Sequence, residues 1–109
     1  MNTTIGAKVR KLWPAEAERA LTLLLAYTGN EGDRVRLATL KLCDGSIESL
    51  EQLIKNARHD YRDLLAWAES PRDMKAGAAP EPMTEEQRRK RSEIHRLDRE
   101  EYERWLADV

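Results

Sequence analysis

Apolar residues recur at intervals of three and four along most of the chain, a spacing that places them on one face of an α-helix. The clearest case is SIESLEQLIKNARHDYRDLLAWAESP, which predicts one unbroken helix over 47–69, about 35 Å long at 1.5 Å per residue. Ser46 is the expected N-cap and Pro71 prevents continuation. The apolar stripe consists of Ile47, Leu50, Ile54, Ala57, Tyr61, Leu64 and Ala68, with Leu53 and Leu65 beside it.

Two shorter helices are predicted before this one. The first spans 14–28, because Pro14 suits the first helical position and Gly29 can adopt the left-handed conformation that closes a helix. The second spans 33–43. Its apolar residues half resemble a strand, but the alternation breaks at Ala38 and no partner strand is predicted elsewhere, so a helix is favoured.

The last helix is predicted over 85–107. It follows the sequence TEEQ, in which Thr84 and Gln87 can form a capping box. The preceding segment, 71–83, contains three prolines and a glycine and is expected to be a flexible linker. Residues 1–12 combine small and polar residues with three positive charges and are expected to be a frayed tail.

The predicted fold is therefore an all-α bundle of about four helices with a flexible linker before the last helix. The expected organisation is a flexible tail at 1–12, a three-helix core at 13–70, a linker at 71–83 and a charged amphipathic C-terminal helix at 84–109.

The charge balance argues against binding to nucleic acids or anionic membranes through a net field. The chain has 109 residues, of which 19 are basic and 20 acidic, so that the formal charge is −1. The first 13 residues contain no apolar core of a signal peptide, and the longest apolar run, 23–27, is too short to cross a bilayer. With a single cysteine, Cys43, these features predict a cytoplasmic protein without an intrachain disulfide.

The last helix begins with a basic cluster, which we define as Arg88, Arg89, Lys90 and Arg91. Seven bases and seven acids balance one another between Glu85 and Trp105, so we expect a solvated helix in which acids and bases four positions apart form ion pairs. The expected pairs are Glu85–Arg89, Glu86–Lys90 and Glu100–Arg104. The alternative hypothesis is nucleic-acid binding through the basic cluster, helped by Lys8, Arg10 and Lys11.

A second route to nucleic-acid binding is geometric. The short turn CDGS joins two predicted helices, as in a helix-turn-helix motif. The second of these helices would then face the phosphates with Glu48 and Glu51, whose negative charge disfavours this interpretation.

Few residues carry a pattern typical of catalysis. His59 and Asp63 lie four positions apart, as two metal ligands on one helix would, but two ligands do not make a site. Arg58 and Arg62 flank them, which favours a surface ion-pair cluster. Cys43 is expected to be buried, and no common catalytic or cofactor motif is found. We therefore predict no catalytic, cofactor or metal residue and favour a protein that is not an enzyme. A small enzyme or metal protein that uses His59 and Asp63 is the least favoured hypothesis.

The tryptophans are expected to anchor the core, with one exception. Trp67 lies beside the apolar stripe and widens it near the end of the predicted helix. A small core and this broad apolar end predict protein–protein contact, including self-association as a homodimer. The predicted interaction surface consists of Tyr61, Leu64, Leu65, Trp67, Ala68, Ile94, Leu97, Tyr102 and Trp105.

The stretch DRVRLATLKLCDGSIESLEQLIKNARHDYRDLLAWAESP, residues 33–71, resembles a family of small all-helical bacterial proteins to which no activity is assigned. The family pattern is a helix of the form RVRLA.LKL..G followed by one that ends in DYRDLLAWAE.P. Here His59 stands where the family would have a basic residue. The resemblance implies a helical bacterial cytoplasmic protein and transfers no functional residue.

Overall fold

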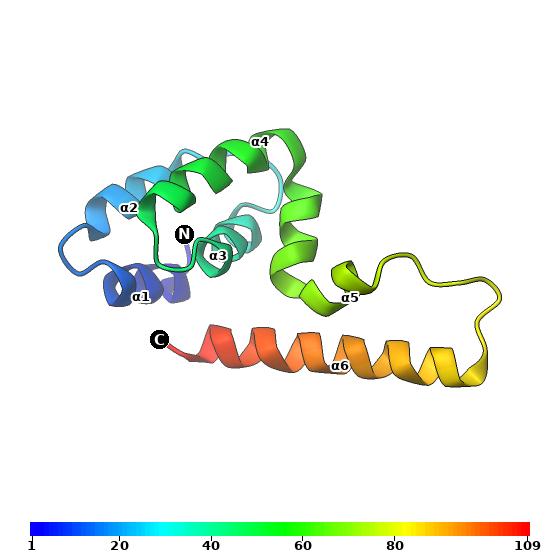
Figure 1. The fold of residues 1–109 in the computed structure, drawn as a ribbon. Coiled ribbons are helices and arrows are strands. Elements are labelled where there is room, and N and C mark those ends of the chain that lie inside the picture. The colour runs from blue at the N-terminus through cyan, green and yellow to red at the C-terminus, as the bar shows by residue number, and fades with distance from the viewer.

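The computed structural model describes all 109 residues and contains six α-helices and no strand. The all-α class is confirmed, and the predicted number of about four helices is too low. The helices are α1 (Thr3–Leu12), α2 (Ala17–Leu25), α3 (Gly32–Leu42), α4 (Ile47–Glu69), α5 (Pro71–Ala76) and α6 (Glu85–Ala107). The molecule is elongated, 51 × 29 × 21 Å, because α6 lies along one side of the other helices (Figure 1).

Residues 1–12 were expected to be a frayed tail, and this prediction is wrong for α1. The side chain of Asn2 accepts a hydrogen bond from the Ile5 amide at 3.0 Å and so caps the helix. Ile5 and Val9, four residues apart, are completely buried against the neighbouring helices. A stripe of two residues is too short to recognise in a sequence, yet it stabilises a helix once other helices cover it.

Helix α2 is shorter than the predicted 14–28 and ends before Gly29. Arg36 of the next helix donates to the carbonyl oxygen of Leu24 in the last turn of α2, at 2.9 Å, and to that of Tyr27 just after the helix, at 2.6 Å. The helical prediction for 33–43 is confirmed by α3, in which Val35 and Ala38 are completely buried.

The prediction of one unbroken helix over 47–69 is wrong at its middle. Asp60 has the extended angles φ −150° and ψ 88°, and α4 consists of two helical segments, 47–59 and 61–69, on either side of it. Figure 1 shows the sharp change of direction between them. The Asp60 carboxylate accepts from the amides of Arg62, at 3.1 Å, and Asp63, at 3.4 Å. Asp60 therefore acts as the N-cap of the second segment.

The linker prediction for 71–83 is corrected at its start, where Pro71 opens the short helix α5. The predicted capping box of α6 is confirmed: the Gln87 amide donates to the Thr84 hydroxyl at 3.1 Å, and the Thr84 amide donates to the Gln87 side chain at 2.8 Å. We call α1–α4 the body and α5–α6 the arm.

The body and the arm are held by different forces. All 17 buried apolar side chains belong to residues between Ile5 and Ala68, within the body. The one buried side chain of α6 is the carboxylate of Asp98, which accepts from the amides of Arg72 and Asp73 at the first turn of α5, both at 3.1 Å. The arm is therefore held together by hydrogen bonds to a buried charge.

Two lysines of the body attach the arm. Lys8 of α1 is buried, donates to the carbonyl oxygens of Trp105 and Asp108, and lies 3.9 Å from the centre of the Trp105 ring. Burial lowers the pKa of this lysine. Lys41 of α3 donates to the Ala68 carbonyl oxygen at 2.5 Å and lies 3.5 Å from a carboxylate oxygen of Glu101 in α6. The C-terminal half of α6 is thus fixed to the body.

Candidate functional site

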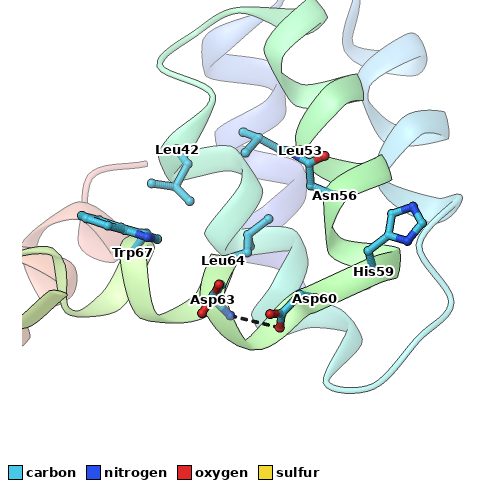
Figure 2. Close-up of a pocket in the computed structure, with 8 residues that line it drawn as sticks. All are labelled: Leu42, Leu53, Asn56, His59, Asp60, Asp63, Leu64 and Trp67. Atoms are coloured by element: carbon cyan, nitrogen blue, oxygen red, sulfur yellow. Dashed lines mark hydrogen bonds between the residues drawn. The ribbon is translucent and has the colours of Figure 1, made fainter. Parts of the chain in front are cut away.

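The break in α4 creates a groove of about 720 Å³ between its two segments and the end of α3 (Figure 2). We call it the bend groove. Its position follows from the sequence at Asp60, because the cap at this residue starts a new helical segment in a new direction. Its lining consists of Leu42, Leu53, Asn56, His59, Asp60, Asp63, Leu64 and Trp67.

Apolar side chains form one part of the bend groove. Leu42 comes from α3, Leu53 from the first segment of α4, and Leu64 from the second. Leu64 is buried and belongs to the core of the body, whereas the Trp67 side chain is 42% exposed. A large aromatic ring that is exposed beside apolar neighbours is typical of a contact surface for another molecule.

Polar side chains form the other part. Asn56, His59, Asp60 and Asp63 are all exposed, and no lysine or arginine lines the bend groove. The Asp60 carboxylate is engaged only with backbone amides, and neither Asp60 nor Asp63 takes part in an ion pair. No ion pair therefore neutralises the two carboxylates at this end of the bend groove, and Arg62 interacts with Asp60 only at longer range.

The predicted ion-pair cluster around His59 and Asp63 does not form. Arg58 points away and donates to the Ala26 carbonyl oxygen at 3.1 Å, and Arg62 lies 5.8 Å from the centre of the Tyr61 ring. The extended backbone at Asp60 also removes the regular helical spacing between His59 and Asp63. Both residues still line the bend groove, but no three His, Cys, Asp or Glu side chains are grouped so that they could hold a metal ion.

Cys43 is buried at the end of α3, as the sequence predicts. Its thiol donates to the Leu40 carbonyl oxygen at 3.2 Å, and burial raises its pKa. The thiolate form is thereby disfavoured, and the residue acts as a small apolar side chain of the core.

The predicted interaction surface is not one surface in the structure. Leu64, Leu65 and Ala68 are buried in the core, and Trp67 alone of the predicted set is exposed, within the bend groove. Tyr61 is half-buried. The predicted residues of α6 are also half-buried: Ile94, Leu97, Tyr102 and Trp105.

The aromatic rings of Tyr102 and Trp105 are in contact, with 5.6 Å between their centroids. Burial, with the nearby charge of Glu69, raises the pKa of Tyr102 to about 12. Trp105 also packs against the core of the body. The apolar edge of α6 therefore docks on its own chain.

The basic cluster is divided by the structure. Arg91 turns toward α5, where it donates to the Asp73 carboxylate at 2.8 Å and to the Gly77 carbonyl oxygen at 2.5 Å. Lys90 lies 3.4 Å from Glu86, so one predicted pair is present. Arg88 and Arg89 are exposed and unpaired, which corrects the prediction of a Glu85–Arg89 pair.

The predicted Glu100–Arg104 pair is also absent, because Glu100 instead accepts from Arg96 at 2.8 Å. Arg96 donates to Glu93 as well, so it joins two acids of α6. The four bases of the basic cluster therefore do not act together, since one is directed into the arm and one is paired along the helix.

Four residues of the bend groove were not singled out as site residues from the sequence: Leu42, Leu53, Asn56 and Asp60. The signal that could have found them is an aspartate, Asp60, inside the apolar pattern, because aspartate is a strong N-cap residue. The pattern continues without a gap across the break, so periodicity alone does not reveal the bend.

No family model, no curated protein and no solved structure matches the chain. The structure adds that none of the six helices has the combination of length and apolar character required to cross a bilayer.

Proposed function

We propose that this protein is a protein–protein interaction module that binds its partner through the bend groove and has no enzymatic activity of its own. The observation that carries the proposal is the exposed ring of Trp67 in a groove that Leu42, Leu53 and Leu64 also line. Tryptophan dominates the energetics of many interfaces because it covers a large apolar area with few rotatable bonds. In keeping with the sequence prediction, we take the protein to be bacterial and cytoplasmic, with a partner that is another protein or a second copy.

The test is retention of proteins on the immobilised chain from an extract of the cells that produce it. The variant Trp67→Ser removes the ring, and Leu25→Ser removes another exposed apolar side chain, 54% exposed, on α2. Proteins retained by the wild type and by Leu25→Ser, but lost with Trp67→Ser, support the proposal. Identical retention by all three chains contradicts it.

Self-association is measured separately by light scattering after size exclusion. A dimer that Trp67→Ser converts to a monomer, while Leu25→Ser does not, would make a second copy the partner. Circular dichroism and urea unfolding of each variant show whether the fold is kept, so that a loss of binding is attributed to the bend groove.

Nucleic-acid binding through the basic cluster is the less favoured function. It is supported by the exposure of Arg88 and Arg89, and it is weakened by the engagement of Arg91 within the arm. Binding of a short labelled RNA or DNA at low salt, lost on neutralising Arg88 and Arg89, would favour it over the bend groove.

A further inference from the structure

The bend groove joins two chemically different surfaces, and this restricts what it can receive. One part is apolar and includes Trp67; the other has the carboxylates of Asp60 and Asp63. We propose that the partner is a basic amphipathic segment of another protein, an inference that rests on the proposed function. This segment places a large apolar side chain against Trp67 and a lysine or arginine against Asp60 and Asp63.

The charge of the bend groove supports this choice. Its titratable lining residues are His59, Asp60 and Asp63, and its net charge is −2 when the histidine is neutral. The two nearest arginines along the chain, Arg58 and Arg62, are directed to the Ala26 carbonyl oxygen and the Tyr61 ring. A basic side chain from a partner would therefore meet two carboxylates that form no ion pair within this protein, whereas an acidic side chain would be repelled.

The spacing within α4 defines the spacing expected in the partner. Asp63 and Trp67 are four residues apart on the helical segment 61–69, so they project from the same face about 6 Å apart along the axis, or one turn. A partner helix that crosses this face can meet both when its apolar and basic residues are three or four positions apart. An arginine fits particularly well, because its planar group can also stack on an aromatic ring.

The first half of α6 in a second copy fits less well. The exposed first half of α6 carries Arg88, Arg89 and Lys90, but its apolar residues Ile94 and Leu97 are half-buried on its own chain. It therefore offers charge to the acidic end of the bend groove without an exposed apolar side chain for Trp67. The end of α1 has the exposed Leu12 next to Lys11, but Lys11 is already paired with Asp108 at 2.7 Å. We therefore assign the occupant to a different protein.

The experiment is a selection from a display library of random 16-residue peptides on the immobilised full chain, with removal of peptides that also bind Trp67→Ser. We expect the recovered peptides to be enriched in a large apolar residue with lysine or arginine three or four positions away. In an NMR amide spectrum, a synthetic copy of the leading peptide should shift the amides that line the bend groove.

Two substitutions test the charge directly. Asp60→Asn keeps a residue that can cap the second segment of α4, and Asp63→Asn removes the second charge without changing the side-chain size. Together they should weaken binding of the leading basic peptide at least tenfold. Asp44→Asn, an exposed aspartate in the turn before α4, is the matched control and should leave the affinity unchanged.

Each outcome separates the inference from the proposed function. Peptides that require Trp67 but show no basic preference would overturn the charge inference and leave the bend groove as an interaction site. The same follows if Asp60→Asn and Asp63→Asn do not weaken binding. If no recovered peptide depends on Trp67, this inference is wrong. The proposed function is tested separately by the retention of cellular proteins. Amide shifts at the bend groove that grow with protein concentration alone would identify a second copy as the occupant, and the inference of a different partner protein would then be wrong.

Discussion

The longest helices of the body and the arm, α4 and α6, both have 23 residues, yet the two regions are stabilised in different ways. The body has 17 buried apolar side chains, and its stability comes from the removal of apolar surface from water. The arm buries one carboxylate, Asp98, and is held by hydrogen bonds and ion pairs that involve Asp73, Arg91 and Lys8. A helix of 23 residues can therefore be positioned by a few polar contacts and a sparse apolar edge that includes Trp105, when another part of the chain supplies the core.

The largest effect is expected from a cavity in the body. Leu50 is completely buried, so Leu50→Ala should lower the free energy of unfolding by about 2–5 kcal/mol. Leu25→Ala, at an exposed position, should change it by less than about 0.5 kcal/mol. Urea unfolding followed by circular dichroism measures both. The arm should unfold together with the body, since it has no core of its own; helix that persists after the body has unfolded would contradict this dependence.

A smaller effect, confined to the arm, is expected from Asp98→Ala. The substitution leaves the amides of Arg72 and Asp73 without their acceptor, which should favour opening of the arm by about 1–3 kcal/mol. Amide hydrogen exchange should accelerate in α5 and α6 and stay unchanged in the body. The isosteric Asp98→Asn retains one acceptor and should have a smaller effect. Equal acceleration in α2 and α3 would show that the body and the arm open as one unit.

Low pH should destabilise the arm more than the body. The hydrogen bond from His95 and the charge of Arg91 hold the pKa of Asp73 below its ordinary value of 3.8, and Lys11 lowers the pKa of Asp108. A lowered pKa in the folded state stabilises the protein above the ordinary value, and this contribution is lost as the pH falls through the lowered one. The protection of arm amides from hydrogen exchange, corrected for intrinsic exchange rates, should therefore decrease when the pH is lowered past about 4.

The control for this pH effect is Asp73→Asn, which should weaken the arm near neutral pH and reduce the further loss in acid. Because the core of the body is apolar, its protection should depend less on pH over the same range. If the amides of the body lose their protection from exchange at the same pH as those of the arm, the predicted difference in acid sensitivity is wrong.

The smallest effect is expected on the exposed side of α6. Glu86 and Lys90 are both 75% exposed and 3.4 Å apart, so Glu86→Gln should change the free energy of unfolding by at most about 0.5 kcal/mol. The measurement is urea unfolding at low and high salt, with Glu48→Gln at another exposed position as the matched control. A loss above 1 kcal/mol would show that this end of α6 contributes more to the fold than its exposure indicates.

The sequence predicts the helices that have long apolar patterns or clear caps. It does not predict the helices whose formation depends on tertiary contacts. The capping box at Thr84 and the helix over 33–43 are confirmed, since both depend on local chemistry. Helix α1 was missed because its stability depends on burial of Ile5 and Val9 by helices that follow later. Helix α5 was missed because the group that caps its amides, Asp98, is 25 residues or more away along the chain.

The site could be predicted only in part. Trp67 was recognised as unusual from its place beside the apolar stripe, and it is the exposed aromatic residue of the bend groove. The groove itself depends on the extended backbone of Asp60, and the apolar pattern has the same period on both sides of this residue. Leu65 and Ala68, expected at a surface, are buried because the bend turns the second segment of α4 back onto the core.

The intrinsic fluorescence of the three tryptophans also provides a way to observe each part of the molecule. Trp13 donates to the Gly45 carbonyl oxygen at 3.0 Å within the body, Trp67 borders the bend groove, and Trp105 lies beneath Lys8 where α6 meets α1. Each indole thus has its own solvent access and its own neighbouring charges. Fluorescence quenching of chains that retain one tryptophan at a time would report separately on unfolding, on partner binding and on release of the last helix.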